Sequence, residues 1–366
     1  MFKSRQRTGA DAVTSRPGHR TLILALAAAG LALGPVSRAG AEDDVYHWTN
    51  PDGGFFQDPD NWNQDNWPGD GQLSISTAPG VVFDLDESYA VTIQEQQDPD
   101  FVLNGRVDVL AGEVSLDAKV PYFLGNDGSS PLLNVGGDGP EGATFRLVGG
   151  ELVAGVGAFP TDVRIGHEAG SRGTVEVTGA DTLLRPRATM HVGYAGEGAL
   201  VVADQAEVGD GIGQLALVIL GGASTGEGTV IARGHWDEAE SDHVGGIRNL
   251  VVGDAGTGNV TVEDGGFAFV DVIGRKPGSH GTVVARGSNS VIRSRRALDV
   301  GFGGDGTLII EDGAGLSTFA GGFSTVEMTV GALEGAEGKV ILRGEGTTWA
   351  PFSVKLQLDS ALEIDP

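Results

Sequence analysis

Residues 165 to 177 read IGHEAGSRGTVEV, and residues 192 to 202 repeat the phrase as VGYAGEGALVV. An aliphatic residue and a glycine open a Gly-rich loop, and a second glycine closes the loop onto a short apolar strand. Successive opening glycines are 21 to 32 residues apart, with a mean near 28. A period of this length is typical of stacked repeat architectures. The eight copies open at Val135-Gly136, Ile165-Gly166, Val192-Gly193, Leu220-Gly221, Val252-Gly253, Ile273-Gly274, Val300-Gly301 and Val330-Gly331.

The loops of this repeat alternate in length. From first to second glycine the span is seven residues in the copies that open at Gly166, Gly221, Gly274 and Gly331. It is five residues in the copies that open at Gly193, Gly253 and Gly301. The repeating unit is therefore a pair of copies, about 55 residues long.

The residues after each loop predict short β-strands. Gly173-Thr174-Val175-Glu176-Val177 is β-branched and alternates, and no helical stripe of apolar residues follows residue 41. One unit has too few apolar residues to bury a face alone, so the next unit has to cover it. We therefore predict an all-β fold, a parallel β-helix or solenoid of 28-residue coils. A two-sheet sandwich also fits the strands, but regular spacing with glycine at the corners favours the solenoid.

Composition narrows the classes of protein and partner. The 366 residues include 61 glycines and no cysteine, and 40% are hydrophobic. The glycines lack the three-residue period of collagen, and the hydrophobic share is too high for a disordered linker. The formal net charge of −26 argues against nucleic acid and anionic membrane surfaces as partners, and it allows divalent cations.

The first 41 residues are typical of an export signal. A basic stretch precedes the 13-residue apolar run 21 to 33, which is too short to span a bilayer, and Ala39-Gly40-Ala41 fits a cleavage site. The alternative is an N-terminal anchor helix. The predicted organisation is a signal peptide (1–41), an N-terminal cap with the first strands (42–100) and Gly-rich solenoid repeats (101–366). We expect an exported chain, extracellular or associated with the cell surface or outer membrane, with no integral membrane segment after cleavage.

The N-terminal segment carries a family resemblance. Tyr46-His47-Trp48, Gly53-Gly54-Phe55-Phe56, Asn61-Trp62, Asn66-Trp67-Pro68 and the strand Ser88-Tyr89-Ala90-Val91-Thr92-Ile93 occur in this order before the repeats. This resembles the Gly-rich β-strand repeat proteins of Gram-negative bacteria and planctomycetes. These are similar to autotransporter passenger regions and to secreted proteins with PEP-type sorting signals. The resemblance covers roughly residues 46 to 350. It implies a parallel β-solenoid with an extracellular or cell-surface role, and it supplies no catalytic residues. The chain departs from the family pattern at Leu362 to Pro366, where we expect neither a sorting helix nor a translocating barrel. Either the anchor is missing or the protein is released.

Two groups of side chains are candidate binding sites. Trp48, Trp62 and Trp67 could form a glycan-stacking face, although an aromatic plug over the open end of the solenoid is the favoured interpretation. His235, Asp237, Asp242 and His243 lie in an insertion between residues 234 and 249 and could hold a metal ion. Their spacing matches no ligand template, which favours a solvated loop.

Calcium is a further candidate ligand, because Asp residues recur in the loops. Neither the nonapeptide calcium pattern nor the EF-hand loop is present, and turn chemistry explains isolated Asp-Gly pairs. No cofactor is therefore predicted, with calcium binding left open. The residues concerned are Asp58, Asp60, Asp65, Asp138, Asp210 and Asp305.

The function predicted from the sequence is structural. Arg185, Arg187, Arg293, Arg295 and Arg296 occupy equivalent corners, where we expect them to pair with carboxylates of adjacent coils. We expect a secreted or cell-surface structural or adhesive protein without catalytic activity. Surface glycans, matrix or other surface proteins are its expected partners. The alternative is a carbohydrate-active β-helix, a polysaccharide lyase or hydrolase or a glycan-binding module.

Overall fold

The structure is a computed structural model. The chain divides into two units, Met1–Ala41 and Glu42–Pro366, and all the described residues lie in the second. The predicted signal peptide is therefore outside the described residues. The described residues are 46–55, 58–63, 81–83, 88–93, 102–103, 107–109, 112–118, 122–124, 133–137, 142–154, 162–186, 189–209, 217–234, 246–294, 297–318, 327–349, 353–356 and 360–365.

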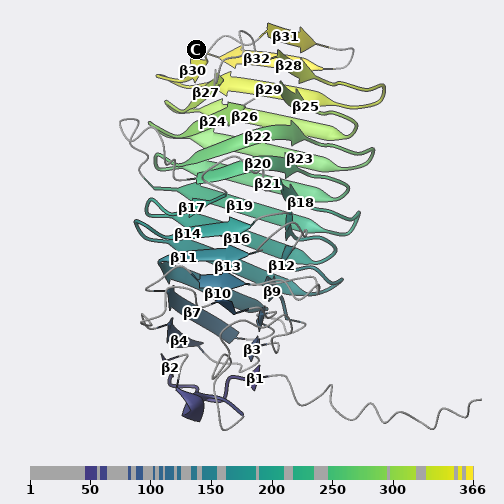
Figure 1. Cartoon of the computed structure of the whole chain (residues 1–366). Helices are drawn as coiled ribbons and strands as arrows, with labels where there is room; N and C mark the ends of the chain where they lie inside the picture. The colour runs from purple at the N-terminus through teal and green to yellow at the C-terminus, as the bar shows by residue number, and fades with distance from the viewer. Residues whose placement is uncertain are drawn as a thin grey trace, which may run out of the picture. The chain divides into compact units, whose positions relative to one another are not determined.

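Two parallel sheets form this unit (Figure 1). The first, here called the long-strand sheet, has twelve strands among the described residues. They are β2 (Gly54–Phe55), β4 (Ser88–Ile93), β7 (Gly112–Ala118), β10 (Ala143–Gly149), β13 (Arg172–Thr178), β16 (Glu197–Ala203), β19 (Glu227–Arg233), β21 (Thr257–Glu263), β23 (His280–Arg286), β26 (Asp305–Glu311), β29 (Gly338–Arg343) and β32 (Ala361–Asp365).

The second, here called the short-strand sheet, receives two short strands from most coils. They are β1 (Tyr46–His47), β3 (Val81–Phe83), β5 (Val102–Leu103), β6 (Val107–Val109), β8 (Tyr122–Leu124), β9 (Leu133–Val135), β11 (Glu151–Ala154), β12 (Val163–Ile165), β14 (Leu183–Pro186), β15 (Thr189–Val192), β17 (Glu207–Val208), β18 (Leu217–Leu220), β20 (Gly246–Val252), β22 (Phe267–Ile273), β24 (Val291–Ser294), β25 (Ala297–Val300), β27 (Gly315–Thr318), β28 (Glu327–Val330), β30 (Thr348–Trp349) and β31 (Ser353–Leu356).

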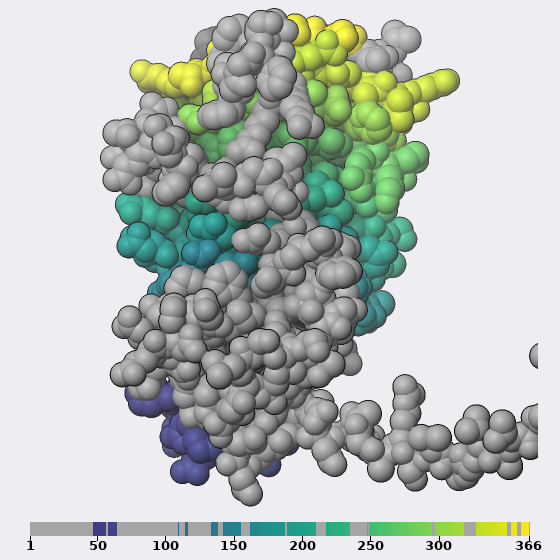
Figure 2. Space-filling view, viewed as in Figure 1, coloured from purple at the N-terminus to yellow at the C-terminus, as the bar shows by residue number. Residues whose placement is uncertain are grey.

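Each coil lies directly on the preceding one, which confirms the predicted parallel β-solenoid. In β13 and β16, Gly173 is opposite Gly198 and Val175 is opposite Leu200. The same one-to-one register joins the strands of the long-strand sheet from β10 to β29. The colours of Figure 2 follow the chain along this stack, from the purple N-terminal coils to the yellow C-terminal ones.

The hydrophobic core is a continuous column between the sheets. Alternate residues of each long strand point inward, so one apolar position per strand is repeated along the stack. Each residue at that position is at most 1% exposed: Val175, Leu200, Val230, Val260, Val283 and Leu308. Burying a side chain of this size contributes about 1.5–3 kcal/mol, which a single coil could not obtain alone.

The two loop lengths of the repeat form two kinds of corner that fit together. In the five-residue corner, the Gly196 amide donates to the Gly166 carbonyl of the preceding seven-residue corner at 3.2 Å. A Cβ on Gly196 would lie 2.4 Å from the Ser171 carbonyl oxygen of that corner, so only glycine fits. The Gly256–Gly221 and Gly304–Gly274 amide-to-carbonyl bonds, of 2.8 and 3.1 Å, repeat the arrangement. The alternation in loop length is therefore a pairing of corners across two coils.

The insertion after Gly234 adjoins a local break in register. Residues 235–245 lie outside the described residues, and β20 follows them. Within β20 the pairing with β22 shifts between Ile247 and Leu250, and Asn249 has a positive φ of 55°. β20 is therefore a single strand that pairs with two separate strands, β17 and β18, of the preceding coil.

The N-terminal strands belong to the same stack as the repeats. β1 pairs with β3, and β4 pairs with β7, so the stacked pairing begins before residue 101. The one helix among the described residues is the short 3-10 turn Pro59–Asn61. No helix in this part of the chain is long and apolar enough to cross a membrane.

Candidate functional site

Two of the three predicted tryptophans, Trp48 and Trp62, are described, and both lie inside the first coil. Trp48 and Trp62 are 1% and 4% exposed, and their rings meet edge to face with centroids 5.1 Å apart. The Trp48 indole N–H donates to the Asn50 carbonyl, so its polar atom has a partner within the protein. These rings are therefore packed as an end plug would be, and their faces are not available to stack on a sugar. Trp67 lies outside the described residues.

The predicted metal and calcium residues lie apart or outside the described ranges. The four predicted metal ligands lie outside the described residues: His235, Asp237, Asp242 and His243. Three of the aspartates considered for calcium do so as well, namely Asp65, Asp138 and Asp210. Asp58 caps the 3-10 turn by accepting the Asp60 amide at 3.1 Å, and Asp305 pairs with His280 Nδ1 at 3.0 Å. Among the residues that the structure describes, no three His, Asp or Glu side chains are grouped to hold a metal ion.

Two of the corner arginines are described, and each contacts a neighbouring coil. Arg185 lies 2.9 Å from the Glu151 carboxylate, as predicted for a pair across coils. Arg293 donates to the Ser317 hydroxyl at 3.1 Å, and its guanidinium lies 5.2 Å from the centre of the Phe267 ring. Both side chains therefore join coils on the short-strand sheet.

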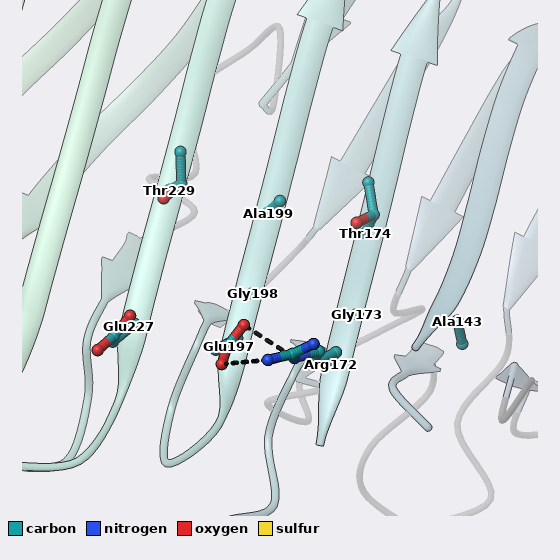
Figure 3. Close-up of a pocket in the computed structure, with 9 residues that line it drawn as sticks. All are labelled: Ala143, Arg172, Gly173, Thr174, Glu197, Gly198, Ala199, Glu227 and Thr229. Atoms are coloured by element: carbon teal, nitrogen blue, oxygen red, sulfur yellow. Dashed lines mark hydrogen bonds and ion pairs between the residues drawn. The ribbon is translucent and has the colours of Figure 1, made fainter. Parts of the chain in front are cut away.

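A shallow depression of about 300 Å³ lies on the outer face of the long-strand sheet, over β10, β13, β16 and β19. Figure 3 shows Thr174, Ala199 and Thr229 side by side on three neighbouring strands. Arg172 and Glu197 form one wall as a two-point ion pair of 3.0 and 3.1 Å, and Glu227 follows on the next strand. Since Glu197 and Arg172 satisfy each other, the depression is a hydrophilic surface hollow. None of its described lining residues is a histidine, serine or lysine that could act as a base or nucleophile.

The depression is one end of a larger regular surface. Outward positions of the long strands form two central columns that carry few charges. The first, here the threonine column, is Thr144, Thr174, Ala199, Thr229, Asn259, Thr282 and Thr307. The second, here the β-branched column, is Val201, Ile231, Thr261, Val284, Ile309 and Ile341.

The last residues of the long strands form a charge ladder beside these columns. From β19 to β32 they are Arg233, Glu263, Arg286, Glu311, Arg343 and Asp365. Hydrogen bonds of 2.9 Å to Glu263 and 2.8 Å to Glu311 tie Arg286 and Arg343 to the coil before. The hydrogen bonds to these glutamates raise the pKa of both guanidinium groups, and the carboxylates nearby add to the effect.

Two histidines and a tyrosine form a cluster that the sequence analysis did not single out. His167 stacks on Tyr194 with ring centres 4.6 Å apart, and His191 meets the edge of Tyr194 at 5.4 Å. A Cβ on Gly222 of the following coil would lie 2.4 Å from the tyrosine ring, so the cluster joins three coils. His167, Tyr194 and Gly222 each follow an opening glycine, and aligning the repeats at that position would have found the contact.

Burial disfavours the charged form of both histidines. Desolvation is the main cause that lowers the pKa of His167 and of His191, with Arg164 lowering both further. Asp162 partly opposes this for both, as do Glu168 for His167 and Asp254 for His191. Neither Nδ1 atom has a hydrogen-bond partner among the described residues, so a proton placed there would be buried without an acceptor.

Acidification is therefore expected to destabilise the fold through this cluster. Because the folded pKa values lie below the unfolded value of 6.5, the unfolded chain binds protons first as pH falls below that value. Stability is lost until the folded pKa is reached and is constant below it. His191→Gln should lessen the fall in unfolding free energy between pH 8 and pH 5, measured by urea denaturation. The exposed His280→Gln is the control, and an equal change in both variants would contradict the assignment.

A second cluster, of charged side chains, joins Asp254 to the corner of the next coil. The Asp254 side chain is 6% exposed and accepts from both Arg275 and Lys276 of the next corner, with Lys276 Nζ at 2.7 Å. Two cations around one buried carboxylate compensate for its desolvation. Asp254 also follows an opening glycine, so the position that carries the ring cluster in one pair of coils carries an ion cluster in the next.

Comparisons with known proteins do not assign the chain to a family. No family model matches it, and searches of curated proteins and of solved structures give no match.

Proposed function

We propose that this protein is a secreted or cell-surface structural or adhesive β-solenoid without catalytic activity. One observation carries the proposal, which is the residue-for-residue register of the long-strand sheet from β10 to β29. Enzymes on repeat scaffolds need a place where the repeat gives way to a constellation of reactive groups. Here the polar side chains of the described coils mainly pair along the stack, as Arg286–Glu263 and Arg343–Glu311 do.

The proposed location depends on the first 41 residues. Their basic start, their apolar run and the Ala39-Gly40-Ala41 site support export, and the absence of cysteine suits a chain stabilised by strand ladders. The resemblance to bacterial surface repeat proteins points the same way. Glycans, matrix or other surface proteins are the proposed partners.

The test is to express the full chain in a Gram-negative host and follow both export and activity. We expect a mature chain that begins at Glu42 by mass spectrometry, outside the cytoplasm and accessible to added protease. The purified protein should yield no unsaturated or reducing ends from acidic and neutral polysaccharides. It should be retained on intact cells or on insoluble glycans.

A chain that lacks residues 1–41 is the matched control, and it should remain inside the cell with the same fold by circular dichroism. Polysaccharide products would instead support the carbohydrate-active alternative. An uncleaved chain in the cytoplasm would contradict the proposed location.

A further inference from the structure

The outer face of the long-strand sheet has the anatomy of a protein interface. Between β19 and β26 its centre is the threonine and β-branched columns, with Thr229, Thr282 and Thr307 beside Ile231, Val284 and Ile309. Beyond β19 the ion pair Arg146–Glu176 at 2.5 Å borders this centre, and on β29 and β32 the two columns end in the ion pair Lys339–Glu363 at 2.8 Å. An uncharged centre within a charged rim is the usual composition of a specific protein interface.

The charge ladder along one edge has an order that complements itself. It alternates in sign over six strands and begins with Arg233 and ends with Asp365. A ladder of even length with alternating sign places each positive group opposite a negative one when a reversed copy lies over it. At the other edge of the face, where the strands begin, His280 is the first residue of β23 and Asp305 the first of β26. A reversed copy centred between these two strands would place His280 opposite Asp305.

We propose that this face, from β19 to β32, binds a second copy of the chain around a two-fold axis. The axis runs parallel to the strands and passes between β23 and β26. Across it, Arg286 of each copy lies opposite Glu311 of the other, Glu263 opposite Arg343, and Arg233 opposite Asp365. The two stacks run in opposite directions, and the Val284 and Ile309 side chains of the β-branched columns meet near the axis.

The size of the face fits such an interface. Six strands spaced about 4.8 Å apart and seven residues long at about 3.3 Å per residue cover roughly 600 Å². A standard protein interface buries about 800 Å² per partner, and the smaller specific ones about 600 Å². Sheets that pack face to face lie about 10 Å apart, which suits side chains of the size of threonine, valine and isoleucine.

A second copy is the occupant that the charges favour. A partner of one charge sign would meet both attractive and repulsive groups along the ladder, whereas a reversed copy meets attractive ones only. The same face on both subunits gives a closed dimer, which does not extend into fibres. The threonine and β-branched columns also lack the aromatic side chains that stack on sugars, which argues against a glycan on these strands.

Sedimentation velocity on the exported chain tests the assembly, and we expect a dimer at micromolar concentration that dissociates as salt rises. Arg286→Glu should raise the dimer dissociation constant at least tenfold, because it places like charges opposite Glu311 twice in each dimer. Arg185→Glu on the short-strand sheet also loses an ion pair across coils and should leave the dissociation constant unchanged. A monomer for the native chain, or equal effects of the two variants, would overturn the proposal.

Cross-linking tests the geometry, since the chain has no cysteine of its own. Thr261→Cys and Ile341→Cys lie on opposite sides of the axis and should face each other between copies. A mixture of the two single variants should form cross-linked dimers with a short bis-maleimide. Neither variant alone should do so, because like positions are offset by three strand spacings, roughly 14 Å. Efficient cross-linking within one variant would show that the copies run in the same direction and would overturn the two-fold arrangement.

Discussion

Gly193→Ala is expected to lower the free energy of unfolding by about 3–5 kcal/mol, among the largest effects of a single substitution. The Cβ of alanine would lie 1.9 Å from the Glu227 carbonyl oxygen of the next coil, and this contact is with backbone that cannot rotate away. The residue also has a φ of 65°, which costs an L-amino acid about 1–2 kcal/mol. The two coils would have to separate locally, which breaks the hydrogen bonds between their corners. Urea denaturation followed by circular dichroism measures the loss.

Gly278→Ala separates these two causes. Gly278 has a similar φ of 78°, but a Cβ there has no heavy atom within 4 Å. This control should lose only the backbone term of about 1–2 kcal/mol. If both variants lose the same free energy, close approach of the coils is not what requires glycine at the corner.

Leu200→Ala is expected to cost about 3–5 kcal/mol, because it opens a cavity inside the column. Leu200 is 0% exposed, and its strand neighbours at the same register are Val175 and Val230. The coils above and below are held by their own strand pairs, so they cannot collapse onto the missing side chain. Hydrogen exchange should show faster opening in β13, β16 and β19 than in the distant β26.

The adjacent Val201→Ala is the matched control. Val201 belongs to the same strand but points to the outer face, where it is only half-buried. It should cost about 1 kcal/mol or less. An equal loss in both variants would mean that the inward column does not carry the stability of the stack.

The sequence predicted the coil and its corners because both depend on local residue patterns. Alternation in segments such as Gly173 to Val177 defines the inward side, and the two loop lengths define the corners. Pairing of corners could not be read directly, since it depends on carbonyl positions in a neighbouring coil, as for Gly196 against Ser171.

The candidate site was harder to predict, because its residues are far apart in the chain. Glu263 and Arg286 are 23 residues apart, and Glu311 and Arg343 are 32 apart, so no local motif joins them. Only the register of the strands brings them together. The same holds for the shift in register at Asn249, which depends on how β20 pairs with β22.

The coupling of long and short corners limits how the gene can change in length. Loss or gain of a single coil would place two corners of the same kind in succession, for example the Gly166 corner beneath the Gly221 corner. The amide-to-carbonyl bond from Gly196 of the short corner to Gly166 of the long one would then have no counterpart. Recombination within the gene should therefore be tolerated in steps of two coils, and homologues of different length should differ by even numbers of them.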